Sequence, residues 1–543
     1  MASLTKKTFD GRTYWYLRET ARVEGRPRVV RTRYLGRAED IEALLTAAYQ
    51  PLEVESVDFG QVAALLTLSR RLGLAEAIDR VAPKRAQGLS VGEQLELCVL
   101  SRACAPCSKR RLAGWYAASA LPRLLGYATS ALSSQRLCDA MGHLHEEQLA
   151  QIEEEVAVRA SSACGLSADT LLFDTTNVAT YLDSATPAQL ARRGHSKTHR
   201  HDLRLVGMAL LYLRGEQVPL LSATYPGNQA DVVTFAEVLG RLWQRGVRVL
   251  GEEANLTLVF DKGMNSERNL ALLAGTPFHF VGSLSLFRHP RFLALREGSA
   301  ERYAQLPGVT AFRGQAHLFG RELTLVLLSS EEFRQKQYRG FLQTLTRAEG
   351  QLAALARPGV RRQTRERRLP QVLARRHLRE VLLVSEEGGQ LTWVRDEAAL
   401  ERLRREVMGY TLLMTDRSDL ATPDIICAYR SQAQIERAFR QMKDADLVAF
   451  TPLWHWTDQK IRVHAFLCVM ALLLLRLLEL EARRAGLTLE AAALMETLAG
   501  IRECTLLYGQ KKAGRPRVVR TLTRCDAQQQ QLFNLLGLER LAP

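Results

Sequence analysis

The sequence has few features of an exported or membrane protein. Its nine cysteines are scattered through 543 residues, which fits a reducing compartment and no disulfide framework. Cys104 and Cys107 have the spacing of a redox or half-zinc motif, but no second pair follows to complete a zinc site. Residues 1–10 lack the apolar core of a secretory signal, and the longest apolar run, 465–475, is too short to cross a bilayer. We therefore expect a cytoplasmic protein with no membrane partner.

The sequence also has fewer acidic than basic residues. The chain has 58 Asp and Glu against 74 Lys and Arg, which gives a formal charge of +16. A basic excess of this size predicts a polyanionic partner, most simply nucleic acid, and an acidic membrane surface is the competing interpretation. Hydrophobic residues make up 47% of the chain and charged residues 24%, as in ordinary globular proteins. A chain of this length divides into about three or four domains.

The two ends of the chain and its first third have different patterns. Short strands punctuated by glycine and proline predict a basic β-meander over 1–50. Helical periodicity predicts a mainly helical module over 51–165, and Lys109, Arg110 and Arg111 give it a basic edge that suits DNA binding. We expect a helical, polar tail over 484–543.

The middle of the chain has the order of elements of an α/β, ribonuclease-H-like domain. Three apolar strand candidates follow one another from residue 170, and then helix and strand alternate twice up to residue 283. In this architecture helices flank a mixed sheet, and its first and fourth strands are neighbours, so residues at their ends can meet. We assign the catalytic domain to 166–286 and 406–483, and an inserted β-containing domain to 287–405.

One octapeptide occurs twice. The sequence Gly-Arg-Pro-Arg-Val-Val-Arg-Thr stands at residues 25–32 and again at 514–521. Gly-Arg-Pro resembles the core of AT-hook peptides, which insert arginines into a narrow minor groove. Two ordinary basic strands are the alternative, and contact with phosphates fits both interpretations.

Three carboxylates are candidates for a catalytic metal site. Asp174 emerges from the first apolar strand, Asp261 ends the fourth before a glycine turn, and Glu436 lies in a later helical run. Burying a carboxylate beside such strands is costly without a cation or hydrogen bonds. Mg²⁺ prefers oxygen ligands, so two or three converging carboxylates with a DNA phosphate suit it. Two such ions would activate a water or a 3′-hydroxyl and stabilise the leaving oxygen.

Four other aspartates are competitors for this role. Asp231 falls where a helix N-cap belongs, and Asp416 and Asp419 flank a turn before the Glu436 helix. Asp202 has no such structural explanation and stays open.

The run that contains Glu436 carries a recognisable motif. Tyr429, Glu436 and Lys443 stand seven residues apart, which places all three on one face of a helix. They match the pattern Tyr-x2-Arg-x3-Glu-x6-Lys, except that Gln432 replaces the arginine. The chain thus resembles bacterial insertion-sequence transposases of the DDE class, in the insertion-sequence-four superfamily. Residues 194–202, 226–231 and 452–464 are similar to further stretches of this family.

The resemblance implies an activity and a set of site residues. It implies an enzyme that binds the terminal inverted repeats of its element, cuts double-stranded DNA and transfers the strand to target DNA. Asp174, Asp261 and Glu436 would be catalytic and would hold Mg²⁺, or Mn²⁺ in its place. A homodimer would bridge two ends in a synaptic complex near the bacterial nucleoid. The residues expected to contact DNA are Tyr429, Arg430, Gln432, Arg440, Lys443, Lys197 and Arg200.

Several features keep two interpretations open. His195, His199 and His201 beside Asp202 suit either a zinc site or a basic loop that touches phosphates. Two tryptophans, Trp454 and Trp456, and an arginine cluster over 361–368 suit either structural roles or contacts with DNA.

Two alternative functions are also consistent with the sequence. One is a DNA-binding protein without catalysis, such as a relic that represses its own element. The other is a cellular metal-dependent nuclease with the same fold.

Overall fold

The computed structural model divides the chain into two compact units. One contains Met1–Gln148, Ala445–Ala449 and Met470–Pro543, and the other Leu149–Asp444 and Phe450–Val469. Residues 2–543 are described, except for 24–25, 50, 83–87, 184, 195–201, 230, 252–255, 262–263, 265, 275–277 and 509–516. The expected DNA contacts Lys197 and Arg200, the three histidines at 195, 199 and 201, and the start of the second octapeptide therefore lie outside the described residues.

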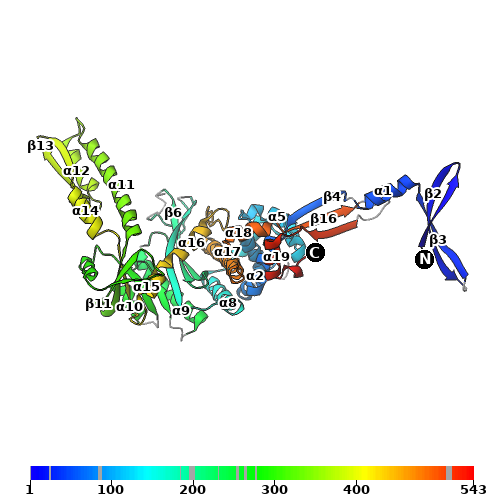
Figure 1. The fold of residues 1–543 in the computed structure, drawn as a ribbon, viewed down its shortest axis with the longest axis horizontal. Coiled ribbons are helices and arrows are strands. Elements are labelled where there is room, and N and C mark those ends of the chain that lie inside the picture. The colour runs from blue at the N-terminus through cyan, green and yellow to red at the C-terminus, as the bar shows by residue number, and fades with distance from the viewer. Residues whose placement is uncertain are drawn as a thin grey trace. The chain divides into compact units, whose positions relative to one another are not determined.

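A nine-stranded mixed sheet is the centre of the second unit (Figure 1). Its order is β10-β11-β12-β15-β9-β8-β5-β6-β7, and β5 runs parallel to β8, which runs parallel to β9. The strands are β5 (Thr170–Thr180), β6 (Arg204–Leu213), β7 (Val218–Pro226), β8 (Thr257–Val259), β9 (His279–Leu284), β10 (Ala300–Arg302), β11 (Val309–Leu318), β12 (Arg321–Ser330) and β15 (Tyr410–Thr415).

The first five of these strands have the ribonuclease-H-like order predicted from the sequence. Strands β5, β6 and β7 form an antiparallel meander, and the helices α9 (Asp231–Leu250) and α10 (Glu267–Ala274) precede β8 and β9. Long apolar runs such as β6 are buried on both faces, as expected for strands covered by helices. The predicted neighbourhood of the first and fourth strands, β5 and β8, is confirmed.

The segment expected as an insertion divides into two parts in the structure. Strands β10, β11 and β12 join the main sheet, because β12 pairs with β15 along six residues. The remainder, after residue 330, has its own apolar core, which includes Leu345, Leu352, Leu378 and Leu400. Its elements are α11 (Glu331–Leu355), α12 (Arg362–Val372), α13 (Leu378–Val381), β13 (Leu382–Glu387), β14 (Gln390–Arg395) and α14 (Glu397–Glu406).

Helices and two small sheets make up the first unit. Strands β1 (Ala2–Phe9), β2 (Arg12–Val23) and β3 (Arg26–Gly36) form one antiparallel sheet, as the meander prediction requires. The predicted helical region is confirmed. Its helices are α2 (Gly60–Leu72), α3 (Leu74–Val81), α4 (Val91–Cys104), α5 (Lys109–Ala117), α6 (Leu121–Leu125), α7 (Ser134–Met141) and, continuing into the other unit, α8 (Glu146–Cys164); α1 (Ala38–Tyr49) precedes them.

The prediction of a helical tail after residue 484 is wrong in part. Helices α18 (Ala491–Ala499) and α19 (Ala527–Leu535) flank two strands, β16 (Arg502–Tyr508) and β17 (Arg517–Leu522). Strand β16 pairs on one side with β17 and on the other with β4 (Glu53–Asp58). Arg502 of β16 donates a hydrogen bond to Ser56 of β4, and these two residues are 446 positions apart in the sequence. Because the partner strand is so distant in sequence, local periodicity did not reveal this sheet.

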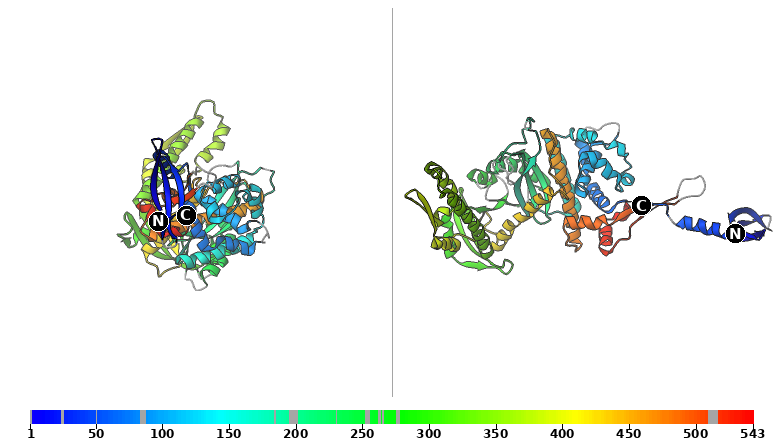
Figure 2. Two further views of the ribbon diagram at one scale, coloured as in Figure 1. Left: turned by 90° about the vertical axis from the view of Figure 1, so that its right-hand side faces the viewer. Right: turned by 90° about the horizontal axis from the view of Figure 1, so that it is seen from above.

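One described helix is long and apolar enough to cross a membrane. It is α17 (Asp458–Arg484), drawn in orange in Figure 2, and it extends well beyond the apolar run seen in the sequence. Within its most apolar window, 94% is buried inside the protein, as in the core helix of a globular domain. Each of the nine cysteines is a free thiol, in line with the expected lack of a disulfide framework.

A buried ionic network joins α8 to the edge of the main sheet. The guanidinium of Arg245 on α9 lies 2.5 Å from a carboxylate oxygen of Glu153 and 2.9 Å from one of Glu154. The carboxylate of Glu153 also accepts hydrogen bonds from the backbone N–H and the hydroxyl of Ser222 on β7. The side chain of Glu153 is 3% exposed and that of Arg245 is 11% exposed, so neither charge is solvated by bulk water.

Removing the buried cation should destabilise the protein strongly. We expect Arg245→Met to cost about 3 kcal/mol, because Glu153 keeps its charge in a site that water cannot reach. Urea unfolding followed by tryptophan fluorescence measures the shift in midpoint. The control is Arg248→Met, which removes an ion pair to the same Glu154 from a side chain that is 58% exposed. It should cost less than about 1 kcal/mol, and equal losses in the two variants would contradict the assignment of the network as buried.

Candidate active site on strands β5, β8 and β9

Polar residues stand side by side on three neighbouring parallel strands. Leu172 of β5 pairs with Val259 of β8, and Val259 pairs with Val281 of β9. Continued by two residues, this register aligns Asp174, Asp261 and Ser283. The backbone N–H of Phe260 donates to the carbonyl of Val281, which extends the pairing towards Asp261. Asp261 lies two residues beyond the end of β8, so the register carries it towards Asp174 on one side and Ser283 on the other.

The helices that follow β15 cross these strands. Helix α15 (Thr422–Arg430) contacts β9 and β15, and α16 (Gln432–Lys443) packs on β5. The sequence predicted one helix with Tyr429, Glu436 and Lys443 on a common face, and this is wrong, because the helix is interrupted at Ser431. The hydroxyl of Ser431 donates to the carbonyl of Ala428, a type of bond that bends helices.

Each of the two helices is anchored to the row of polar residues. The hydroxyl of Tyr429, on α15, lies 2.8 Å from the hydroxyl oxygen of Ser283 and 3.4 Å from a carboxylate oxygen of Asp261. At the other end, the ammonium of Lys443 donates to the hydroxyl of Thr176, at 2.6 Å, and to the carbonyl of Asn177, at 3.1 Å.

Glu436 lies midway between these two anchors. Seven residues separate it from Tyr429 and seven from Lys443, so α16 carries it across the strands that hold Asp261 and Asp174. The side chain of Glu436 is exposed, Asp261 is exposed, and Asp174 is half-buried. The three acids are therefore accessible from solvent.

The environment of Tyr429 reflects the nearby negative charge. Burial of the phenol, with the carboxylates of Asp261 and Glu436 close by, raises the pKa of Tyr429 to about 12, although the Ser283 hydrogen bond opposes the shift. The neutral phenol is therefore the form present at physiological pH, and it can donate a hydrogen bond to an anion.

The donor set of this site suits a hard cation. Three carboxylates offer only oxygen ligands, which Mg²⁺ and Mn²⁺ accept. Across the described residues, no three acidic, histidine or cysteine side chains gather closely enough to hold a metal ion. Asp174 also accepts a hydrogen bond from the backbone N–H of Thr175, at 2.7 Å, which fixes one of its oxygens.

The remaining predicted site residues have different surroundings. Arg430 and Arg440 are exposed on α15 and α16. Gln432, at the position of the motif arginine, is half-buried, and its amide nitrogen has no hydrogen-bond partner among the described residues. Arg437, a nearby arginine on the same helix, donates a hydrogen bond to the side-chain oxygen of Gln217, at 2.6 Å.

The competing aspartates have structural partners. Asp416 accepts a hydrogen bond from the backbone N–H of Phe280, at 2.9 Å, and Asp419 forms an ion pair with Arg417, at 2.7 Å. Asp231 is the first residue of α9. The contacts of Asp416 and Asp419 explain two of the four carboxylates without a catalytic role.

Sequence reasoning missed the residues that hold the site together. Ser283, Thr176 and Asn177 are uncharged, and nothing in their own segments distinguishes them from other strand residues. Strand register was the signal that could have revealed them. Thr176 and Asn177 lie two and three residues after Asp174 on β5. Val281 of β9 pairs with Val259 of β8, and Ser283 and Asp261 each follow that pair by two residues.

A cavity of about 560 Å³ opens beside Tyr429. Its lining includes Ser283, Phe287, Phe333, Arg376 and Tyr429. The guanidinium carbon of Arg376 lies 4.4 Å from the centre of the Phe287 ring, and that phenylalanine is 63% exposed. The cavity thus combines aromatic and cationic groups next to the row of acids.

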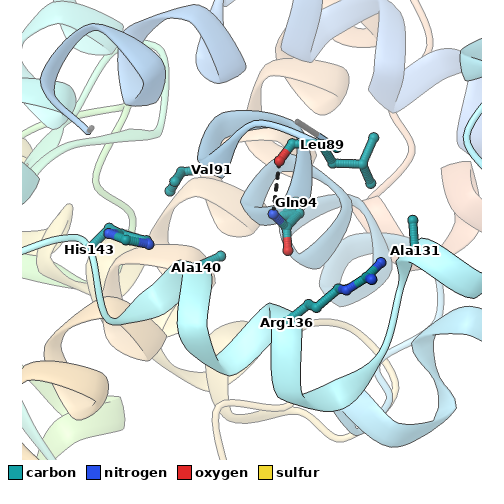
Figure 3. Close-up of a pocket in the computed structure, with 8 residues that line it drawn as sticks. Leu89, Val91, Gln94, Ala131, Arg136, Ala140 and His143 are labelled. Carbon is teal, nitrogen blue, oxygen red and sulfur yellow. Dashed lines mark hydrogen bonds between the residues drawn. The ribbon is translucent and has the colours of Figure 1, made fainter. Parts of the chain in front are cut away.

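A second cavity, of about 370 Å³, lies within the helical region of the first unit (Figure 3). Gln94, Arg136 and His143 contribute its polar groups, and Gln94 donates to the carbonyl of Leu89, at 3.1 Å. None of its described lining residues is a carboxylate, unlike the acids of the predicted catalytic site.

Comparison with known proteins identifies the family. Residues 166–474, more than half of the chain, match the family described as the transposase DDE domain. A comparison with curated protein sequences gives no significant match.

Two solved transposase complexes show weak structural similarity. A piggyBac transposase synaptic complex with hairpin DNA is 9% identical over 80% of this chain and 79% of that one, with a TM-score of 0.36. A Mos1 transposase paired-end complex with the left transposon end is 14% identical over 36% of this chain and 60% of that one, with a TM-score of 0.15. The family match covers the whole row of acids and both helices that cross it, and the chain belongs to the transposases with a DDE domain.

Proposed function

We propose that this transposase binds the terminal inverted repeats of its element, cuts the DNA by metal-dependent hydrolysis and joins the cut end to target DNA. The observation that supports this most directly is the parallel pairing of β5, which carries Asp174, with β8, which ends two residues before Asp261. The helix that carries Glu436 is anchored across the same strands through Lys443. We also propose that the chain belongs to the insertion-sequence-four superfamily, in the branch with the Tyr-Arg-Glu-Lys motif, because Tyr429, Glu436 and Lys443 have the spacing of that motif.

Asp174, Asp261 and Glu436 are the proposed catalytic residues and the proposed ligands of Mg²⁺, for which Mn²⁺ substitutes. Bound divalent ions would stabilise the charge that develops on the attacking and leaving oxygens of a phosphodiester. The protein contributes a carboxylate on β5, a second just beyond the end of β8, and a third on α16, which Lys443 anchors to β5. In cleavage a water attacks the phosphodiester, breaks the bond from phosphorus to the 3′-oxygen and releases a 3′-hydroxyl. In joining, this hydroxyl attacks a target phosphodiester and displaces the 3′-oxygen of the target strand, so that one phosphodiester replaces another.

The polar groups around the acids are suited to hold the DNA backbone. Tyr429 is neutral and presents a hydrogen-bond donor beside Asp261, and Lys443 supplies a fixed positive charge at β5. Arg430 and Arg440 are exposed on the same two helices and are suited to contact phosphates further along the strand. Gln432, Lys197 and Arg200 complete the proposed DNA-binding set.

The cavity beside Tyr429 is suited to a nucleotide near the cleaved end. Aromatic side chains and guanidinium groups stack on bases irrespective of sequence. Phe287 and Arg376 provide both kinds of group in this cavity. We further propose that a homodimer holds two ends together in a synaptic complex, so that cutting and joining take place on paired ends.

Removing any one of the three acids should abolish cleavage but preserve DNA binding. We expect Asp174→Asn, Asp261→Asn and Glu436→Gln each to lower Mg²⁺-dependent nicking of labelled end DNA by at least about a thousandfold, because each loses a negative charge needed at the metal. Gel electrophoresis measures nicking, and fluorescence anisotropy measures binding.

The matched control is Asp419→Asn, which makes the same change in an exposed, ion-paired aspartate near α15. It should cut at the wild-type rate. Full activity in any of the three acid variants would remove that residue from the catalytic set. Binding without nicking by the wild-type protein would favour a non-catalytic repressor, and equal cutting of unrelated DNA without joining would favour a cellular nuclease.

The proximity of Asp261 to Tyr429 can be tested without measuring activity. Ionisation of Tyr429 should require a pH near 12. Its contribution is the difference in tyrosinate absorbance between the wild-type protein and Tyr429→Phe during a pH titration. In Asp261→Asn this component should titrate at a lower pH, because a negative charge that opposes ionisation is gone. The raised pKa also means that stability from the neutral phenol is present below pH 10 and is lost as pH rises through about 12. An unchanged titration in Asp261→Asn would contradict the contact.

A further inference from the structure

The sheet formed by β1, β2 and β3 is unusually exposed and basic. Along β3, each of the first nine residues is exposed, and these include Arg26, Arg28, Arg31 and Arg33. A sheet of three strands that buries so little apolar surface gains little stability from packing. Packing therefore does not explain why it carries so many basic residues. The face of the sheet that each arginine occupies is therefore informative.

The register of β3 against β2 places all four arginines on one face. Arg33 pairs with Leu17 and Arg31 with Glu19, and after a β-bulge Arg28 pairs with Ala21 and Arg26 with Val23. Paired residues share a face, and the four partners on β2 are spaced by two. In a regular strand Arg28 and Arg31, three residues apart, would face opposite ways. The extra residue of the bulge, Val30, brings them to the same side.

Two further residues extend this face across the sheet. Lys6 of β1 pairs with Trp15 of β2, and Trp15 is two residues from Leu17, so both lie on the side of the arginines. The opposite face carries a group of tyrosines, with the ring centres of Tyr16 and Tyr34 5.3 Å apart, and by the same register the basic residues Lys7, Arg12, Arg18 and Arg22. Glu19 is the one acidic residue among the described residues of the arginine face.

The second copy of the octapeptide has a different register. Arg517 pairs with Tyr508 of β16 and Arg520 with Thr505, with no interruption between them. These arginines correspond to Arg28 and Arg31, but without a bulge they point to opposite faces of their sheet. One peptide sequence therefore gives a one-sided cationic surface in β3 and a two-sided strand in β17.

We propose that the face formed by Lys6, Arg26, Arg28, Arg31 and Arg33 binds the sugar-phosphate backbone of duplex DNA. The partner class rests on the proposed function, and the site rests on the register. Four arginines at successive same-face positions extend over about 20 Å, since a strand rises about 3.3 Å per residue. One DNA strand places a phosphate every 3.4 Å along the axis, so about six phosphates lie within this length.

Protection of an edge strand is the simpler explanation of charge on β3. Charged side chains on an edge discourage pairing with another chain, and their effect does not depend on which face they occupy. A bulge that collects four cations on one face is not needed for that purpose. A row of four cations on one face suits the backbone of a duplex, because only one face of a sheet can lie against DNA at a time.

The test compares the two copies of the octapeptide in the full-length protein. The probe is a labelled duplex of mixed sequence, several helical turns long, without divalent metal so that no cutting occurs. The slope of log affinity against log salt concentration counts phosphate contacts at about 0.9 each. Arg28→Gln with Arg31→Gln should flatten the slope by about 1.8 and weaken binding at every salt concentration.

The matched control is Arg517→Gln with Arg520→Gln, which removes the same charge from the same local sequence. Because its two arginines face opposite ways, at most one can contact a duplex, so the slope should change by no more than about 0.9. Equal effects of the two pairs would overturn the proposal, since net charge alone would then explain binding.

A charge-neutral exchange gives a second test that does not depend on removing arginine. Arg28→Val with Val29→Arg keeps the composition but moves one cation to the tyrosine face. We expect the slope to flatten by about 0.9, with an unchanged circular dichroism spectrum. A slope equal to that of the wild type would contradict the role of the face.

The same proteins test whether another polyanion is the ligand, and whether the arginine face and the proposed catalysis stand or fall independently. Stronger binding to single-stranded RNA or to phosphatidylserine vesicles than to the duplex would overturn the proposal. Loss of the salt-slope effect with intact Mg²⁺-dependent nicking would refute the arginine face and leave the proposed catalysis standing. The salt-slope effect without nicking in the wild type would support the face and refute the catalysis.

Discussion

The parallel pairing of β5 with β8 is the constraint on which the candidate site depends. Asp174 lies on β5 and Asp261 two residues beyond the end of β8, so the pairing of these buried strands brings two like charges to the same region of the sheet although they repel each other. Leu171, Leu172 and Phe173 are fully buried immediately before Asp174, as are Leu258, Val259 and Phe260 before Asp261. The apolar residues thus fix the position of the acids, and the acids remain at the edge of that core.

Much of this centre could be predicted from the sequence. The alternation of apolar strands and helices between residues 170 and 283 gave the strand order, and the order gave the neighbourhood of Asp174 and Asp261. What the sequence could not give was the path between Tyr429 and Glu436. Ser431 interrupts the helix through a local hydrogen bond to Ala428, and helical periodicity alone does not distinguish a bent helix from a straight one.

Long-range pairing accounts for the other differences between sequence and structure. Strands β10 to β12 belong to the main sheet because β12 pairs with β15, although a mainly helical segment separates the two strands in the sequence. The strands of the C-terminal region exist because β16 pairs with β4 from near the other end of the chain. In both cases the decisive contacts join segments that no local window contains, so propensity could suggest the strands but not their partners.

The bulge in β3 has a consequence for how substitutions and insertions act on this chain. Which way Arg26 and Arg28 point is decided by the number of residues in β2 opposite them, and therefore by a strand that contributes none of the four arginines. One residue inserted between Glu19 and Thr20 would supply a partner for Val30 and turn Arg26 and Arg28 to the tyrosine face. Every cation would still be present, yet the charged surface would be divided in two. The same eight residues can therefore be intact in sequence and lost as a surface.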